Sequence, residues 1–266
     1  MSQVIPIGAV EEAKIIFQFS CIVKEDEKLS KFSFPKWCLE FFSRVTHYNL
    51  EESRKYLLSY IDLVNSMPSV FVWSDKLYQV NQDQIHCISK ASNAAGGKII
   101  LFRPGLCDLK TVSPFEAIHA AGINIWTEIA LNPDVHHHGM EVIVDAKGTT
   151  FGHLWSVTLN QFKLSAALNN FVQEKIVTKV HMVNCNRVMR IAFELLRPFI
   201  KTEVFNQYVF YGEDLSKLYE SCPKSSLPAE YGGTFDDDYT MDERMSRFEV
   251  SRPLLEALWE QVKQVD

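Results

Sequence analysis

Long apolar runs and dense basic segments are both missing from this sequence of 266 residues. No stretch approaches the roughly 18 apolar residues of a membrane-spanning helix, and the N-terminal segment lacks the charged and apolar regions of a secretory leader. The net charge is −6, and no cluster of Lys and Arg with interleaved aromatic residues occurs. We therefore expect a cytoplasmic protein that does not bind nucleic acid.

Paired cysteines are missing as well. The sequence has six cysteines, at positions 21, 38, 87, 107, 185 and 222, without a C-x-x-C pair or the spacing of a zinc site. It also has no Asn-x-Ser/Thr glycosylation site. We expect reduced thiols in the core or at the surface, and no metal site.

The sequence further lacks the loops that bind phosphates and the turns that carry nucleophiles. No G-x-x-x-x-G-K-[ST], G-x-G-x-x-G or G-x-S-x-G pattern is present, and the glycine pair in AAGGKIILF precedes a strand instead of separating a strand from a helix. A nucleophile and base set could be drawn from His153, His181, Asp145 and Cys185. Their spacing does not bring them together, and a histidine inside an apolar strand is typical of a hydrogen-bonded core. We expect no catalysis and no cofactor.

Apolar residues, in contrast, make up 47% of the sequence, which is enough for a sizeable core in one or two domains. Residues 10–67 have apolar positions three and four apart, which predicts amphipathic helices that end before Pro68. The predicted divisions are an all-α N-terminal unit at 1–70, a main domain at 71–235, and an acidic loop with a final helix (251–264) at 236–266.

Strand and helix patterns alternate from residue 98 onward. Short apolar segments predict strands at KIILFRPG, MEVIVDAKG, KVHMVN and QYVFYG. The helical patterns are SPFEAIHAAGINIWTEIALN, TLNQFKLSAALNNFVQEKI, NRVMRIAFELLRPFI and, after the last strand, EDLSKLYESC. This alternation predicts an α/β domain with a parallel or mixed sheet that is covered by helices.

The segment NPDVHHHGMEVIVDAKG, residues 132–148, raises the question of whether three adjacent histidines bind a metal. Adjacent side chains point in different directions on a strand or a helix, so His136, His137 and His138 do not easily converge on one ion. Asn-Pro favours a turn, and Gly139 suits a tight entry into the next strand. We predict a loop, then a strand, then a loop.

Residues 188–200 form an amphipathic pattern with a broad apolar face and a charged face that carries Arg190, Arg197 and Lys201. An ordinary surface helix packed on a sheet would show the same periodicity. A lid is the alternative, because Pro198 removes a backbone hydrogen bond and an amphipathic helix with a basic edge can settle on a membrane.

The segment LPAEYGG, residues 227–233, resembles the closing motif of the CRAL-TRIO lipid-binding family. GMEVIVDAKGTTFGH is similar to the family's strand that ends in Asp before a Gly-His pair, and KIILFRPGLCD resembles its first strand. KVHMVNCNRVMRIAFELLRPFI resembles its strand, Asn turn and gate helix. FFSRVTHYNLEESRKYLLSYIDL is similar to its helical N-terminal unit, so the resemblance covers most of residues 35–235.

This resemblance implies a mixed sheet flanked by helices, an apolar pocket under a gate helix at 187–205, one bound lipid and no catalysis. Thr127 or Ser165 could hold a hydroxyl group of the ligand, directly or through water. The candidates for the pocket wall are Ile123, Thr127, Val144, Phe151, Trp155, Phe162, Ser165, Leu168, Phe171, Val180 and Met182, and those for the inner face of the gate are Ile191, Leu195 and Phe199. Each of these side chains is also typical of an ordinary core.

The family's tocopherol and retinaldehyde carriers hold phosphoinositide headgroups with basic residues before the third strand and at the end of the gate. At the matching positions this sequence has Ile176, Thr178 and Gln207. We expect headgroup recognition to be lost or weakened. The alternative is a headgroup site rebuilt from Lys175, Lys179, Arg197 and Lys201, with Arg190 on the same membrane-facing edge.

We therefore predict a monomeric carrier of one hydrophobic small molecule, such as a tocopherol, a retinoid, a carotenoid or a similar isoprenoid, which it releases at a membrane surface. A phospholipid or phosphoinositide is the alternative ligand. A lipid-sensing adaptor, whose bound lipid regulates contact with a protein partner, is the alternative function.

Overall fold

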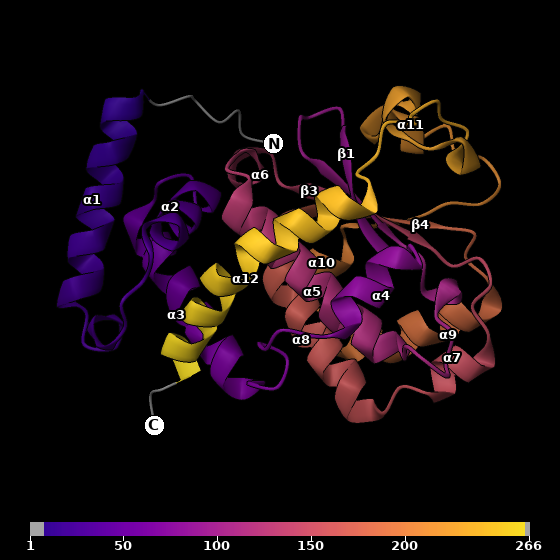
Figure 1. Cartoon of the computed structure of the whole chain (residues 1–266), viewed down its shortest axis with the longest axis horizontal. Coiled ribbons are helices and arrows are strands. Elements are labelled where there is room, and N and C mark those ends of the chain that lie inside the picture. Colours follow the sequence, from indigo (N-terminus) through magenta and orange to yellow (C-terminus); the bar gives the residue numbers. More distant parts are fainter. Residues whose placement is uncertain (1–7, 264–266) are drawn as a thin grey trace. The chain divides into compact units, whose positions relative to one another are not determined.

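Two compact units make up residues 8–263, which the computed structural model describes (Figure 1). The first contains the residues up to Val72 together with those from Ser251 onward, and the second contains Trp73–Val250. The division falls within helix α12 (Met241–Lys263), so this helix contributes to both units. Within the described residues, no helix is both long and apolar enough to cross a lipid bilayer.

The first unit is all-helical, as the apolar spacing predicts. Asn49 starts one of its helices by accepting a hydrogen bond from the Glu52 amide at 3.1 Å. Its core is aromatic, with the Phe42 ring 5.4 Å from Tyr56 and the Phe71 ring 6.0 Å from Trp259 of α12. The elements are α1 (Ala9–Glu25), η1 (Leu29–Lys31), α2 (Lys36–Val45) and α3 (Leu50–Ser66).

Helix α12 begins earlier than predicted, at Met241 instead of residue 251, so part of the predicted acidic loop is helical. Thr240 and Glu243 explain this start. The Glu243 amide donates to Thr240 Oγ1 at 3.2 Å, and the Thr240 amide donates to Glu243 Oε2 at 2.7 Å, which is a capping box. The acidic side chains also suit the positive end of the helix dipole. Residues 236–266 are therefore shared between the two units instead of standing apart.

The second unit contains a five-stranded sheet with the order β1-β2-β3-β4-β5. The β1–β2 pair is antiparallel and all other pairs are parallel, so the predicted mixed sheet is confirmed. The strand β1 was not predicted, which makes KIILF the second strand and not the first. Its turn to β2 contains Asn93, which accepts from the Gly97 amide at 2.8 Å, and Gly96, whose φ is 86°. The strands are β1 (His86–Ser92), β2 (Lys98–Phe102), β3 (Met140–Asp145), β4 (Val177–Val183) and β5 (Tyr208–Phe210).

The connecting helices cover one face of this sheet (Figure 1). Strands β2 to β5 lie side by side in chain order, so right-handed crossovers place every connection on the same side. Helix α5 packs against β1, and α8 packs against β4 and α9. The elements are α4 (Lys76–Gln82), η2 (Pro104–Leu106), α5 (Pro114–Leu131), α6 (Asp134–His138), α7 (Phe151–Trp155), α8 (Leu159–Lys175), α9 (Arg187–Leu196), η3 (Arg197–Phe199) and α10 (Thr202–Phe205).

The opposite face of the sheet is covered by the segment that follows β5. Ile99, Leu101, Ile143 and Val183 of the strands pack there against Leu218, Cys222, Leu227 and Tyr231. The predicted helix at EDLSKLYESC is only four residues long, because Asp214 and Ser216 form a turn with a 2.8 Å hydrogen bond instead. The elements are α11 (Leu218–Ser221), η4 (Lys224–Ser226) and η5 (Ala229–Tyr231).

The three adjacent histidines belong to the short helix α6 and not to a loop, which corrects the prediction. Pro133 precedes this turn of helix, and Asn132 accepts a hydrogen bond from the Asp134 amide at 3.2 Å. His136 is buried, with its Nε2 2.7 Å from the Ile129 carbonyl oxygen, whereas the next two histidines are exposed. The strand that follows, β3, lies where it was predicted.

Candidate functional site

An apolar cavity of about 240 Å³ lies in the second unit, between the sheet and the helices that cover it. For comparison, one water molecule needs about 10–15 Å³ of such space. Among the described residues that line the cavity, none is Asp, Glu, Lys or Arg. The cavity is therefore suited to an uncharged, largely apolar molecule, because a buried charge without a partner would be costly.

Alternate side chains of two neighbouring strands form the floor of the cavity. Val142 and Val144 of β3 line it, and so do their register partners on β4, Val180 and Met182. Successive side chains of a strand point to opposite faces, so the residues between these four face the other side of the sheet. The periodicity of two in MEVIVD and KVHMV is thus what positions an apolar floor.

Helix α9 closes the cavity above this floor. Its start is fixed by Asn186, which accepts from the Met189 amide at 3.0 Å and donates to the Thr149 carbonyl at 2.9 Å. The outward side of the helix carries the exposed residues Arg190 and Leu195. The residues of α9 that line the cavity are Val188, Met189, Ala192, Phe193 and Leu196.

The predicted inner face of this helix, Ile191, Leu195 and Phe199, does not line the cavity. Leu195 is 45% exposed, and Phe199 packs with Ile200 and Val204 beyond the end of the helix. The helix is turned by about one residue, or about 100°, relative to the prediction. Its apolar stripe is broad, so the periodicity alone could not decide which part faces the sheet.

The predicted wall residues fall into two groups. Those that line the cavity are Val144, Phe162, Ser165, Leu168, Val180 and Met182. Their contact with a ligand stays a prediction. Ile123, Thr127 and Phe171 are buried elsewhere: Phe171 stacks on Trp126, with 6.5 Å between ring centroids, and it is Trp126 that reaches the cavity. Thr127 lines a separate small pocket beside Arg247.

Phe151 and Trp155 lie outside the cavity, which corrects their prediction as wall residues. Their rings stack on each other at 6.3 Å, and they are 45% and 75% exposed. Both belong to the short helix α7, whose other side places His153 and Leu154 in the cavity wall. The segment TTFGHLW carried no strand or helix pattern in the sequence, so nothing there indicated which side of it would face solvent.

A few polar groups lie among the apolar lining, and spacing did not reveal them. Gln173 donates from Nε2 to the Tyr208 hydroxyl at 2.9 Å, while its buried Oε1 has no hydrogen-bond partner in residues 8–263. Burial raises the pKa of Tyr208, so its hydroxyl stays protonated. Burial also lowers the pKa of His86 to about 3, an effect to which the positive charge of Arg244 adds. His86 is therefore neutral, and its Nδ1 accepts from Asn124 at 2.8 Å.

The four residues considered as a nucleophile and base set are not brought together. No hydrogen bond links any two of them within the described part of the chain. Asp145 accepts from Asn184 and Tyr231, at 2.8 and 3.1 Å. His181 is 2.8 Å from Glu141, His153 contacts Thr150 and the Cys107 carbonyl, and Cys185 is only partly buried.

Comparison with known proteins identifies the family to which this domain belongs. Residues 82–233, which are more than half of the chain, match the CRAL/TRIO domain. The chain belongs to the CRAL/TRIO lipid-binding family. Its five-stranded mixed sheet, the helices on one face and the apolar cavity are thus the CRAL/TRIO domain of this protein.

Several relatives of known name are similar to this CRAL/TRIO protein. Alpha-tocopherol transfer protein-like from Homo sapiens and from Pongo abelii are each 23% identical over 206 residues, which cover 73% of this chain and 57% of the relative. Clavesin-2 from Mus musculus is 24% identical over 105 residues, or 38% of this chain and 31% of the relative. The chain therefore spans little more than half the length of the first two relatives. A crystal structure of Sfh5 aligns over 95% of this chain and all of that one, at 11% identity and a TM-score of 0.49.

The LPAEYGG motif of this CRAL/TRIO domain closes the sheet face opposite to the cavity. The Tyr231 hydroxyl donates to Asp145 Oδ2 at 3.1 Å and accepts from Arg103 Nε at 3.2 Å, while Arg103 also pairs with Glu230. Gly232 has a φ of 72°, which disfavours other residues. The motif thus ties the end of β3 and the loop after β2 to residues 211–235, which follow β5 and cover this face of the sheet. These residues are called the closing segment below.

The predicted headgroup residues do not form one cluster. Lys179 Nζ donates to Ser221 Oγ at 2.7 Å on the far face of the sheet, and Lys201 pairs with Glu174 at 2.8 Å. Arg197 lies over the Phe205 ring at 4.7 Å, whereas Arg190 is exposed on α9 and Lys175 ends α8. Lys179 therefore lies on the other side of the sheet from the helices that carry the remaining basic residues, so the four predicted residues do not share one headgroup site.

Proposed function

We propose that this protein binds one hydrophobic small molecule of the isoprenoid type, such as a tocopherol, a retinoid or a carotenoid, and carries it between membranes without catalysis. The cavity is the observation that carries this proposal, since its lining is apolar and uncharged. A ligand that buries a few hundred Å² of apolar surface gains several kcal/mol at about 25 cal/mol per Å². Relatives named alpha-tocopherol transfer protein-like support the same ligand class.

Helix α9 is the proposed gate. It is short, it walls the cavity, and it is followed by Pro198 in a 3-10 turn, where backbone hydrogen bonding is interrupted. The residues beyond it are held by an apolar cluster that includes Ile200 and Val204. A hinge at the turn would let α9 swing outward while this cluster stays in place.

Contact with a membrane is proposed to open this gate. Helices α7 and α9 both line the cavity with one side and expose apolar residues on the other, namely Phe151, Trp155 and Leu195. Exposed aromatic side chains partition into the lipid interface, and Arg190 on the outside of α9 suits an anionic surface. One docking event would therefore engage both helices that close the cavity.

The few polar groups in the cavity lining support a ligand with a hydroxyl group. Gln173 lines the cavity and has a buried carbonyl oxygen without a hydrogen-bond partner in the described residues, which a rotation of the side chain would present to a ligand hydroxyl. Of the two hydroxyl-binding residues predicted from sequence, Ser165 lines the cavity, although its own hydroxyl donates to the Gln161 carbonyl at 2.8 Å. A ligand alcohol can donate to Gln173, whereas an aldehyde or ketone cannot.

The compartment and the assembly state complete the proposal. We propose a cytoplasmic monomer. The six free cysteines are compatible with a reducing compartment, and the cavity is complete within one chain.

Native mass spectrometry of the purified protein, followed by organic extraction, tests the proposed function. We expect one co-purified isoprenoid with a hydroxyl group. A co-purified phospholipid would replace the proposed ligand class by the alternative one. An empty protein that also takes up no tocopherol, retinoid or phospholipid analogue would contradict the carrier, and would favour an adaptor.

Loss of the exposed aromatic rings of α7 should slow transfer. In the double variant Phe151→Ser, Trp155→Ser we expect the rate of ligand release to lipid vesicles to fall at least about tenfold, because each ring contributes about 1.5 kcal/mol or more on burial. Ligand loading should stay unchanged, since neither ring lines the cavity. Fluorescence-monitored transfer to vesicles measures the rate.

Phe17→Ser is the matched control for this experiment. Phe17 is 67% exposed but belongs to helix α1 of the first unit. Its loss should not change the transfer rate. Equal slowing in both variants, or in neither, would contradict membrane docking through α7.

Gln173→Leu should remove the preference for alcohols. We expect the unmodified protein to bind retinol about tenfold more tightly than retinal, and the variant to bind both alike, since a hydrogen bond to a buried carbonyl contributes about 1–1.5 kcal/mol. Titration of intrinsic tryptophan fluorescence with each ligand measures both affinities. A preference for retinal, or an unchanged preference in the variant, would contradict this role of Gln173.

A further inference from the structure

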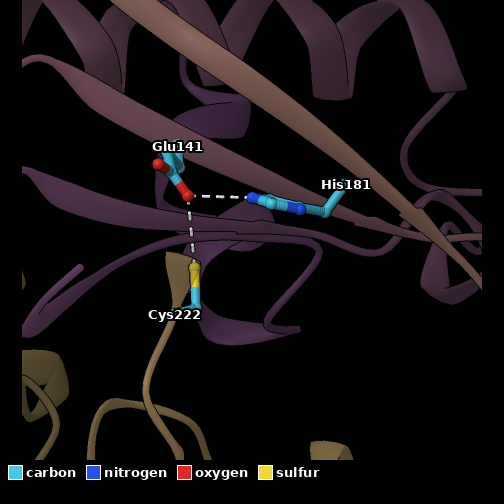
Figure 2. A group of neighbouring side chains, drawn as sticks. All are labelled: Glu141, His181 and Cys222. Atoms are coloured by element: carbon cyan, nitrogen blue, oxygen red, sulfur yellow. Dashed lines mark hydrogen bonds and ion pairs between the residues drawn. The ribbon is translucent and has the colours of Figure 1, made fainter. Parts of the chain in front are cut away.

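A buried cluster of three different donor groups lies on the sheet face opposite to the cavity (Figure 2). Glu141 Oε2 is 2.8 Å from His181 Nε2 and 3.5 Å from Cys222 Sγ. The donor atoms of all three residues lie within 4.8 Å of one another, and all three residues are buried. Figure 2 shows the His181 ring nitrogen and the Cys222 sulfur pointing toward the same Glu141 oxygen. Neither the cavity nor the closing motif uses them.

Strand pairing and a helix end position these donors. Glu141 and His181 come from the neighbouring parallel strands β3 and β4, where Glu141 pairs with Lys179 and Ile143 with His181. They therefore stand diagonally on one face of the sheet, one residue away from floor residues of the cavity. Cys222 ends helix α11, and its amide donates to the Leu218 carbonyl at 2.8 Å.

We propose that Glu141, His181 and Cys222 form a binding site for a divalent metal ion of the zinc type. A thiolate, an imidazole nitrogen and a carboxylate oxygen are the donors that Zn²⁺ prefers. Zinc bonds of about 2.0 Å to oxygen and 2.3 Å to sulfur, at tetrahedral angles, separate those two atoms by about 3.5 Å. The separation of Glu141 Oε2 and Cys222 Sγ is 3.5 Å, so this pair already has the spacing of two zinc ligands.

The surroundings of the cluster suit a metal ion as well. His181 Nδ1 is 2.8 Å from the Tyr211 hydroxyl, a contact of the kind that orients a metal-bound imidazole and leaves Nε2 for the ion. One carboxylate and one thiolate neutralise the two positive charges of Zn²⁺. Three protein ligands leave the fourth position for a water molecule.

Metal binding at this site would release protons from the ligands and would involve no redox chemistry. Cys222 loses its thiol proton to solvent, and the proton between His181 Nε2 and Glu141 either moves to Nδ1, on the Tyr211 side, or leaves to solvent, so that Nε2 can bind the ion. Because the Cys222 thiol must give up its proton to bind the ion, zinc affinity should rise with increasing pH. The bound ion would join β3 and β4 to the segment that covers them.

Titration of the metal-free full chain with Zn²⁺ tests the site. Native mass spectrometry should show one ion per chain, and the melting temperature should rise with zinc concentration. Co²⁺ in place of Zn²⁺ should give the charge-transfer absorption of a cobalt–thiolate bond. No bound ion, or bound cobalt without this absorption, would overturn the proposal, and neither readout depends on a lipid in the cavity.

Two variants locate the ion. Cys222→Ser should lose the cobalt–thiolate absorption and nearly all zinc affinity, and Tyr211→Phe should weaken zinc binding about 10- to 100-fold. Cys21→Ser, which removes a more accessible thiol of the first unit, should bind zinc like the unmodified protein. Undiminished binding by Cys222→Ser, or loss of binding with Cys21→Ser, would place the ion elsewhere and overturn the proposal.

Discussion

Leu196→Asp is expected to reduce ligand loading by at least about 100-fold. Leu196 belongs to the cavity lining of α9, so the new carboxylate would face an apolar surface without a partner. Such burial costs about 3 kcal/mol or more, and about 1.4 kcal/mol corresponds to a tenfold change in affinity. Equilibrium binding of a fluorescent tocopherol analogue, at a pH near 7, measures the loss.

The neighbouring residue supplies the matched control. Leu195 is 45% exposed and does not line the cavity, so Leu195→Asp should load ligand like the unmodified protein. Circular dichroism should show that both variants are folded. Equal losses in the two variants would mean that α9 does not face the ligand in the way proposed. Leu196 also packs against the cluster around Ile200, so its substitution could disturb that packing. Ala192→Trp is therefore a second variant. It fills the cavity without a charge and should also reduce ligand loading.

Gly233→Ala is expected to destabilise the protein by about 3 kcal/mol or more, one of the largest effects for a single methyl group. A Cβ atom at Gly233 would lie 1.9 Å from the Leu227 carbonyl oxygen, which is backbone and cannot move aside cheaply. The closing segment would have to leave the sheet, and with it the Tyr231 hydroxyl that donates to Asp145. Urea denaturation at equilibrium measures the change in the free energy of unfolding.

Gly212→Ala serves as the control for this prediction. Gly212 is exposed, and a Cβ atom there would meet nothing within 4 Å. Its substitution should change the free energy of unfolding by no more than about 0.5 kcal/mol. A small change in the free energy of unfolding for Gly233→Ala would contradict this prediction. It would show that the closing segment can shift at little cost and that the motif does not hold it rigidly.

The sequence predicts the sheet well because its periodicities are short and strong. MEVIVD and KVHMV alternate apolar side chains toward both faces, and both became strands at the predicted places. The strand β1 was missed, because HCISKAS mixes polar and apolar residues. Its signal is the glycine pair Gly96 and Gly97, which marks a turn between two strands as readily as it suggests a phosphate loop.

The cavity was harder to predict than the sheet, for reasons of geometry. Floor residues such as Val180 and Met182 follow from strand alternation, which allows only two faces. A helix with a broad apolar stripe has no such restriction, so Leu195 was assigned inward although it faces outward. Polar contacts such as that of Gln173 with Tyr208 depend on residues 35 positions apart, which no local spacing records.

The alternation of side chains along β4 limits the sequence changes that this strand can accept. Val180 and Met182 form the floor of the cavity, while His181 between them lies in a polar cluster on the reverse face. A shift of β4 by one residue would place an imidazole in the cavity and an apolar side chain beside Glu141. Exchanges of Val and Met in place would therefore reshape the ligand site and leave the reverse face unchanged, whereas an insertion or deletion within β4 would exchange its two faces.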